Sequence, residues 1–350
     1  MLKKSAKCLQ VIAGVLIIVS MKSNAFALEI DDKPFTSAKV DIPGAHSSVQ
    51  LIHRNRAYSG GLSSLWVSRD CSQLITISDY SQTPDSMLDG PVNRSAWFQA
   101  DIEFDQQGAL QRVNLIEQGQ VKNIDGAVID GAIESMAWGD DGFYLSFDHH
   151  SNIYYYPGTK PAGVLFNQTP TIAIEQSHLG TADDGLEALS YLGNNQFLAI
   201  WEKQHKSDRA IAAVISSEQK RKRFDFLTPT DASGATTLND GSVIILQKQY
   251  LGPKIGNRVR VNHISATTLA NIADNSQETP VNSTLLFDKT SLYYDNFEGI
   301  SACYRDNQQW LFMLSDDNGD WPENMVEKKG KKRQRTLLLM VNLNELFTSN

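Results

Sequence analysis

The sequence has few cysteines and few long apolar runs. Three of its 350 residues are cysteine, too few for a small fold held together by disulfides. No apolar run after the first 21 positions approaches the roughly 20 residues that a membrane-crossing helix needs, which excludes a multispan membrane protein. At 41% hydrophobic residues the chain can still bury one large core or two smaller ones. We therefore expect a folded protein.

Several catalytic motifs are also missing. The sequence contains no G-x-S-x-G elbow, H-E-x-x-H helix, Walker loop, C-x-x-C pair or G-x-G-x-x-G turn. The segment Gly61-Leu62-Ser63-Ser64-Leu65 comes nearest to the elbow, but it lacks the last glycine and lies on an expected strand. Any active site therefore has to be sought among residues that the fold brings together.

The N-terminal segment has the pattern of a secretory signal peptide. Three lysines in the first seven residues precede the apolar segment Val11–Met21, and Ala25-Phe26-Ala27 supplies a small-x-small cleavage site. We predict a signal peptide over residues 1–27, a single mature domain over 28–350, and a periplasmic or secreted location. Retention of the segment as a membrane anchor is the alternative.

Cleavage changes the charge and the cysteine count. Four lysines and no acidic residue leave with the segment, so the formal charge moves from −8 to −12. Such an acidic protein is a poor general partner for nucleic acid, whose phosphates need cations. Cys8 leaves as well, so Cys71 and Cys303 remain. In an oxidising compartment these two can form one disulfide, and two free thiols are the alternative.

One pattern recurs five times along the chain. Each copy has a short strand of small or apolar residues, a polar turn, and a β-branched or aromatic run, which predicts a β-hairpin. The five copies are Gly61–Asp79, Ile133–Asp148, Leu186–Glu202, Asp231–Gln247 and Glu298–Asp316.

Further strand-like stretches lie between the hairpins, and no convincing helix does. Two inner and about two outer strands, repeated five times, predict an all-β protein: a β-propeller of five four-stranded blades. A sixth, degenerate blade stays open, and a β-sandwich is the structural alternative. We expect Val49–Tyr58 to pair beside Leu337–Leu343 and close the ring, which would bring Cys71 and Cys303 toward the same end.

The hairpin geometry predicts an acidic rim. In an antiparallel pair, the start of the first strand and the end of the second lie at the same edge. Eight carboxylates occupy these positions: Glu134, Glu187, Asp231 and Glu298 at starts, and Asp79, Asp148, Glu202 and Asp316 at ends. Such a cluster needs protonation, arginine partners or a divalent cation, and calcium with its six to eight oxygen ligands suits it best. Solvated or backbone-capping carboxylates are the alternative reading.

Arginines on the same side of the ring are candidates for binding an anion. Arg258 and Arg335 stand where long, charged loops re-enter strands, so neighbouring strands can hold their planar guanidinium groups in place.

The motifs in their order along the chain resemble a known family. The segment GGLSSLWVSRDCSQLITISD (Gly60–Asp79) resembles the opening of phytase-like proteins described by "esterase-like activity of phytase". Further matches are Leu186-Glu187-Ala188-Leu189, Pro229-Thr230-Asp231, Glu298-Gly299-Ile300-Ser301, Ser315-Asp316-Asp317-Asn318 and Gln334-Arg335-Thr336. The resemblance implies an exported bacterial propeller. Similarity to β-propeller phytases would further imply calcium-assisted hydrolysis of phosphomonoesters.

Two functions follow as hypotheses. In the first, the chain is a calcium-dependent hydrolase of phosphate or carboxyl esters that acts on a small, anionic or ester substrate. Glu187 and Glu298 would be catalytic, Arg258 and Arg335 would bind the substrate, and the metal ligands would be Glu134, Glu187, Asp231, Glu298 and Asp316. In the second, the chain is a non-catalytic exported binding module, because propellers host enzymes and scaffolds alike.

Overall fold

A computed structural model describes most of the chain from residue 35 onward. The described residues are 35–53, 61–81, 94–122, 132–147, 150–158, 172–173, 185–201, 208–216, 221–274, 280–281, 283–317 and 334–348. They belong to one compact unit, Lys33–Asn350. The predicted signal peptide, residues 1–27, lies outside the described residues.

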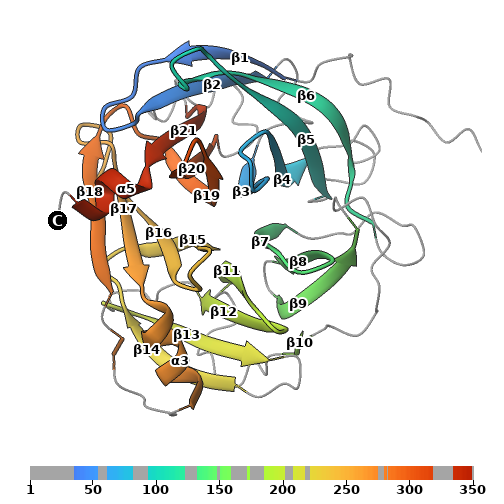
Figure 1. Ribbon diagram of the computed structural model, residues 1–350, viewed down its shortest axis with the longest axis vertical. Helices are drawn as coiled ribbons and strands as arrows, with labels where there is room; N and C mark the ends of the chain where they lie inside the picture. The colour runs from blue at the N-terminus through green and yellow to red at the C-terminus, as the bar shows by residue number, and fades with distance from the viewer. Residues whose placement is uncertain are drawn as a thin grey trace, which may run out of the picture. The chain divides into compact units, whose positions relative to one another are not determined.

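Five antiparallel sheets are arranged around a common axis (Figure 1). The inner strands are β3 (Leu62–Val67), β7 (Ile133–Trp138), β11 (Leu186–Gly193), β15 (Asp231–Thr237) and β19 (Asn296–Arg305). Each contacts the inner strands of the sheets before and after it, and β19 contacts β3, so the ring is closed. The predicted five-bladed β-propeller is confirmed. The described residues form no sixth blade and no two-layered sandwich.

The remaining strands follow outward in each blade. The second strands are β4 (Gln73–Ser81), β8 (Gly142–Phe147), β12 (Gln196–Trp201), β16 (Val243–Tyr250) and β20 (Gln308–Asp316). The third are β5 (Arg94–Phe104), β9 (His150–Pro157), β13 (Arg209–Ser216), β17 (Asn257–Ile264) and β21 (Thr336–Asn342). The fourth strands of blades one to four are β6 (Leu110–Gln120), β10 (Ile172–Ala173), β14 (Arg221–Leu227) and β18 (Thr284–Ser291).

Blade five is completed by the N-terminal strands. Strand β2 (Ser47–His53) pairs with β21, with Val49 opposite Leu338, and β1 (Phe35–Val40) pairs with β2. The predicted pairing of the closing strand with β21 is therefore confirmed from Val49 to Leu51, and residues 54–58 lie outside the described chain. This blade has five strands where four were expected, since β1 adds a further outer strand.

Burial explains why some strands read as continuous apolar runs. Every residue of β8 and every residue of β21 is buried, because their sheets pack against neighbouring blades on both faces. The tight turns have the expected chemistry: Asn194 and Asn195 both have positive φ (52° and 55°), as do Asp306 and Asn307 (52° and 58°). Consecutive positive φ values are typical of the two-residue hairpin turn that matches strand twist.

The expectation that no helix would form is wrong. Helix α3 (Ala266–Asp274) begins after Ser265, whose hydroxyl accepts a hydrogen bond from the Thr268 amide at 3.2 Å. It buries Leu269 and Ile272 against blade three, and α5 (Leu343–Thr348) follows β21. Neither helix in the described part of the chain has the length and apolar character that crossing a bilayer would take.

Candidate functional site

A β-bulge recurs at the same place in all five inner strands. The register slips by one residue near the start of each strand, which leaves one extra residue unpaired. The extra residues are Ser63, Glu134, Glu187, Ser233 and Glu298. A bulge re-aims the side chain of the extra residue, so blades two, three and five each present a glutamate at equivalent positions of the rim.

The second strands return to the same rim. In each blade, the inner-strand residue just before the bulge pairs with one residue of the second strand. The next residue along the chain is Asp79, Asp148, Glu202, Lys248 or Asp316 in blades one to five. Asp148 and Glu202 lie outside the described residues. The others place two carboxylates and one ammonium group at this edge.

Blade four departs from the sequence prediction. Asp231 lies two residues before the bulge and pairs opposite Lys248, so Ser233 and not Asp231 holds the position equivalent to the glutamates. At the strand end, Lys248 and not Gln247 matches the acids of the other blades. The sequence carried a signal for this correction, because Ser233-Gly234 aligns with Glu298-Gly299 once both glycines are taken as the residue after the bulge.

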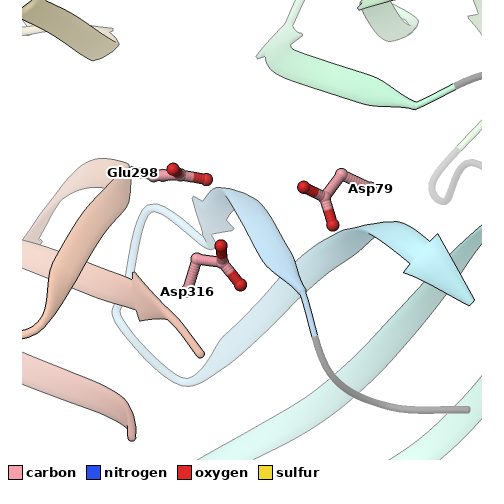
Figure 2. Close-up of side chains that lie close together, drawn as sticks. All are labelled: Asp79, Glu298 and Asp316. Carbon is pink, nitrogen blue, oxygen red and sulfur yellow. The ribbon is translucent and has the colours of Figure 1, made fainter. Parts of the chain in front are cut away.

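Three carboxylates converge at the rim (Figure 2). Asp79, Glu298 and Asp316 each offer an oxygen, and these oxygens all lie within 4.8 Å of one another. Asp79 ends the first hairpin, whereas Glu298 and Asp316 begin and end the last one, so ring closure brings them together. We call these three residues the carboxylate triad. Burial and spacing together make the triad a candidate cation site.

Crowded negative charge is evident at Asp79. Burial raises the pKa of its carboxyl group well above the ordinary value, and the charges of Glu298, Glu134 and Asp317 raise it further, against an opposing effect of Lys248. Its Oδ1 atom is buried and accepts no hydrogen bond from the described residues. A buried carboxylate oxygen without a donor is costly unless it is protonated or binds a cation.

Lys248 supplies a positive charge beside the triad. Its Nζ pairs with Glu298 Oε1, and Asn296 Nδ2 donates to the same oxygen at 2.7 Å. Burial alone would lower the pKa of the Lys248 ammonium group, but the charges of Glu298, Glu187 and Asp316 and the hydrogen bond to Glu298 hold that pKa above its ordinary value. The ammonium group therefore stays charged and offsets part of the acidic cluster.

The predicted metal ligands are thus only partly brought together. Glu298 and Asp316 belong to the triad, while Glu134 and Glu187 lie near enough to act electrostatically on Asp79 and Lys248, respectively. Asp231 is not among the largest influences on the pKa of either residue. Asp79 was expected at the rim but not among the ligands, and Lys248 was not expected at all.

The two predicted anion-binding arginines are bound internally. Arg258 makes a two-pronged contact with Asp288, at 2.7 and 2.6 Å, between β17 and β18. Arg335 donates to the buried Asp295 at 2.9 Å and to the Tyr293 carbonyl at 2.6 Å. Both guanidinium groups are therefore engaged in holding blades four and five.

Cys71 and Cys303 are joined by a disulfide with a Cα–Cα distance of 5.4 Å. The bond connects the turn of the first hairpin to β19, at the end of the propeller opposite the acidic rim. It belongs to the framework and not to the carboxylate cluster.

A family model and several solved structures are similar to this chain. None of the curated proteins matches the sequence. Similar solved structures include a thermostable family-43 glycoside hydrolase (8% identity, 81% of this chain and 93% of that chain, TM-score 0.44) and the glutaminyl cyclase of Myxococcus xanthus (7%, 81% and 92%, 0.39). A GH43_1 enzyme from Xanthomonas citri gives 12% identity, 89% and 88% coverage, and a TM-score of 0.39. All three TM-scores are below 0.5.

A family model gives the firmer result. Residues 57–319, about three quarters of the chain, match the phytase-like model described as "Esterase-like activity of phytase". The matched range begins before the first hairpin and ends just after the last, so it contains all three members of the carboxylate triad. The chain therefore belongs to the phytase-like family.

Proposed function

We propose that the chain is a calcium-assisted ester hydrolase with its reaction centre at the carboxylate triad. The mutual spacing of the three carboxylate oxygens, within 4.8 Å, carries this proposal. Calcium binds oxygen at about 2.3–2.6 Å, so two oxygens on one ion lie at most about 5 Å apart. The spacing suits calcium without any movement of the strands.

The chemistry of the site also suits a cation. Asp79 Oδ1 has no hydrogen-bond donor among the described residues, and neighbouring negative charges raise the pKa of Asp79. A divalent ion would coordinate that oxygen and relieve the repulsion among Asp79, Glu298 and Asp316, which reaches about 4 kcal/mol for a pair at 4 Å.

Protein groups around the triad have distinct roles in this proposal. Calcium would supply a Lewis acid that polarises a phosphoryl or carbonyl oxygen. Glu187, which lies near Lys248, is the candidate base that takes a proton from water. The Lys248 ammonium group and the Asn296 amide both bind Glu298 Oε1 and fix the orientation of that carboxylate. We assign no substrate contact to Arg258 or Arg335, because carboxylates already engage both.

Hydrolysis of simple chromogenic esters tests the proposal. With p-nitrophenyl phosphate and p-nitrophenyl acetate, we expect calcium-dependent turnover of at least one ester, abolished by a calcium chelator. Glu298→Gln should lower kcat by about 100-fold, in the range typical of a lost acid–base or electrostatic group. Asp274→Asn is the matched control, because Asp274 is an exposed carboxylate at the end of α3.

Two results would decide against hydrolysis. One is a turnover rate unchanged by Glu187→Gln and Glu298→Gln together. The other is thermal stabilisation by calcium without turnover of any ester, which would make the chain a non-catalytic binding module.

Export is a separate part of the proposal. The basic and apolar N-terminal pattern supports a signal peptide over residues 1–27, and a disulfide suits the periplasm or the outside of the cell. N-terminal sequencing of exported protein checks this directly, since a first residue other than Leu28 would contradict the cleavage site.

A further inference from the structure

A hollow opens at the end of the inner strands opposite the carboxylate triad. It encloses about 370 Å³, and all five inner strands contribute to its lining. We call it the far cavity, and six of its lining residues carry the argument: Trp66, Trp138, Tyr191, Thr237, Asn239 and Gln309. Strands rise about 3.3 Å per residue, so Trp138 stands about 13 Å along β7 from Glu134. The far cavity is therefore distinct from the carboxylate triad.

One side of the far cavity is a fixed aromatic surface. The rings of Trp66 and Trp138 stack at 4.8 Å with an interplanar angle of 28°, and both meet the ring of Phe143 edge-on. Both tryptophans are only half-buried. Because neighbouring side chains already hold the two indole rings in place, little side-chain entropy would be lost when a ligand binds against them.

Tyr191 extends this surface in the next blade. Its hydroxyl donates to Asp140 Oδ2 at 2.6 Å, and its ring is parallel to that of Tyr144 at 5.7 Å. The Tyr191 side chain is thus fixed by two contacts, one through its ring and one through its hydroxyl group. Aromatic area from blades one, two and three therefore faces the same space.

The remaining lining offers hydrogen-bonding groups. Ser190 and Thr237 share a hydrogen bond of 2.6 Å between blades three and four, and each hydroxyl keeps capacity for another partner. Asn239 and Gln309 contribute amide groups that no other described residue engages. Among the described lining residues only Arg69 is charged, and it is exposed. The far cavity has none of the carboxylates that a metal would need.

We propose that the far cavity binds a small neutral carbohydrate, a mono- or disaccharide. A sugar ring presents C–H groups that pack on the electron-rich face of an aromatic ring, and hydroxyl groups that pair with hydroxyl and amide side chains. The far cavity supplies both surfaces, and its volume lies within the range of about 300–1,000 Å³ found for small-molecule sites. This inference does not depend on the proposed hydrolysis, which occurs at the opposite rim.

Calorimetric titration and tryptophan fluorescence of the mature protein test this inference. The probes are glucose, galactose, N-acetylglucosamine and maltose. We expect at least one sugar to bind and to change the fluorescence, because two tryptophans line the far cavity. Gln309→Ala should weaken that binding by about tenfold while leaving ester hydrolysis unchanged. Trp138→Leu should weaken it further, with folding checked by circular dichroism.

Glu298→Gln is the control at the opposite rim. It should leave the sugar affinity unchanged while ester hydrolysis falls. A failed proposal for the carboxylate triad can therefore be distinguished from a failed proposal for the far cavity. The inference is overturned if no sugar binds with a dissociation constant below about 10 mM. It is also overturned if folded Gln309→Ala and Trp138→Leu bind as the wild type does, or if Glu298→Gln abolishes binding.

Discussion

At the scale of single residues, the acidic rim is a balance of charges. Lys248 is the equivalent of Asp79 and Asp316 in its own blade, and it pairs with Glu298. One ammonium group cannot neutralise the whole cluster, and burial together with the charges of Glu298 and Glu134 raises the pKa of Asp79. The rim thus stores repulsion that a bound cation would relieve.

The ionised Asp79 carboxylate destabilises the folded protein at neutral pH, because its pKa is raised in the native state. Its ordinary pKa is 3.8, so the unfolded chain loses this proton first, and stability falls as the pH rises from 3.8 to the higher native value. Asp79→Asn removes that cost. In calcium-free buffer at about pH 7.5, well above the ordinary pKa of an aspartate, we expect the variant to melt about 2–4 °C higher than the wild type. Near pH 4 the two proteins should have the same melting temperature.

Calorimetry at both pH values checks this prediction, with Asp274→Asn as the matched control. Calcium should raise the melting temperature of the wild type and have little effect on Asp79→Asn. A variant that melts lower than the wild type at neutral pH would show that Asp79 contributes a favourable interaction instead of a penalty.

At the scale of single elements, the hairpins were predictable and their bulges were not. Alternation and turn residues such as Asn194-Asn195 mark where strands begin and reverse. Neither the hydrophobic pattern nor a turn residue marks the extra residue of a bulge, and a glycine follows it only in blades four and five, so Asp231 was expected where Ser233 lies. The sequence therefore predicted an acidic rim, but not which residues form the triad.

In blades four and five, the neighbouring inner strand leaves no room for a side chain at the position after the bulge. A Cβ atom on Gly234 would lie 2.5 Å from the carbonyl oxygen of Glu298, and one on Gly299 would lie 2.7 Å from Leu65 Cβ. Serine hydroxyls also join neighbouring inner strands: Ser63 donates to the Ile133 carbonyl at 2.6 Å between blades one and two, and Ser233 to the Phe297 carbonyl at 2.9 Å between blades four and five. Inner-strand packing therefore sets the position of the glutamates.

Gly234→Ala should disturb both the fold and the triad. The added methyl group must displace backbone, so we expect the free energy of unfolding to fall by about 1–3 kcal/mol in urea titrations. Because the displaced carbonyl belongs to Glu298, calcium affinity should fall as well. Ser64→Ala, at the equivalent position in blade one, is the control: its hydroxyl is buried with no hydrogen-bond partner in the described chain, so stability should hold or rise. Equal stability of Gly234→Ala and wild type would contradict the packing argument.

At the scale of the whole molecule, the ring is closed at the seam between blades one and five. Strands β1 and β2 complete blade five and reach blade one, where the Val113 amide donates to Ser37 Oγ at 2.9 Å and the Leu110 amide to Ser47 Oγ at 2.8 Å. Closure was predictable, since a propeller without it leaves an exposed sheet edge. The added strand β1 was not, because nothing in FTSAKV distinguishes an outer strand from a loop.

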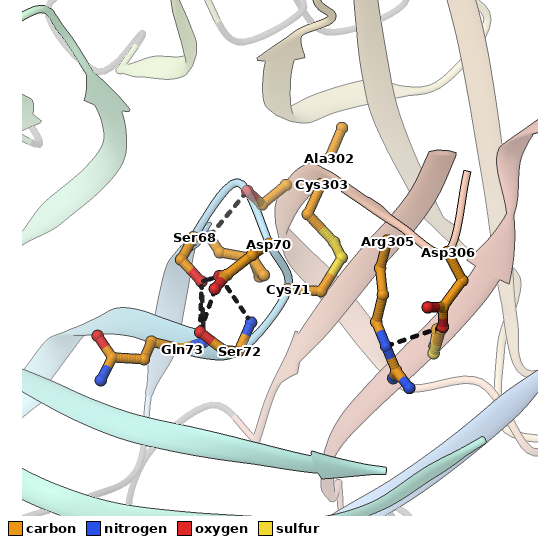
Figure 3. The surroundings of a disulfide bond; sticks show 12 residues. Ser68, Asp70, Cys71, Ser72, Gln73, Ala302, Cys303, Arg305 and Asp306 are labelled. Atoms are coloured by element: carbon orange, nitrogen blue, oxygen red, sulfur yellow. Dashed lines mark hydrogen bonds and ion pairs between the residues drawn. A yellow bond between two sulfur atoms is a disulfide. The ribbon is translucent and has the colours of Figure 1, made fainter. Parts of the chain in front are cut away.

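The disulfide between Cys71 and Cys303 also joins blades one and five, through the turn of the first hairpin and β19 (Figure 3). Cys71 lies in a turn where Ser68 and Ser72 donate to Asp70 at 2.7 Å each, which lowers the pKa of Asp70. The Tyr304 amide donates to the Arg69 carbonyl at 2.8 Å beside it. The bond joins residues 232 positions apart, so it encloses about two thirds of the chain in one covalent loop.

Cys71→Ser together with Cys303→Ser should therefore destabilise the propeller without changing its fold. Cross-linking a loop of this length restricts the unfolded chain, and such bonds typically contribute about 2–4 kcal/mol to the free energy of unfolding. In urea titrations we expect the double variant to lose about that amount, and a reductant to lower the wild type to the same level while leaving the double variant unchanged. Cys303 also lines the far cavity, whereas the triad lies at the opposite rim, so sugar binding should weaken more than ester hydrolysis. A double variant as stable as the oxidised wild type would mean that β1 and β2 close the ring alone.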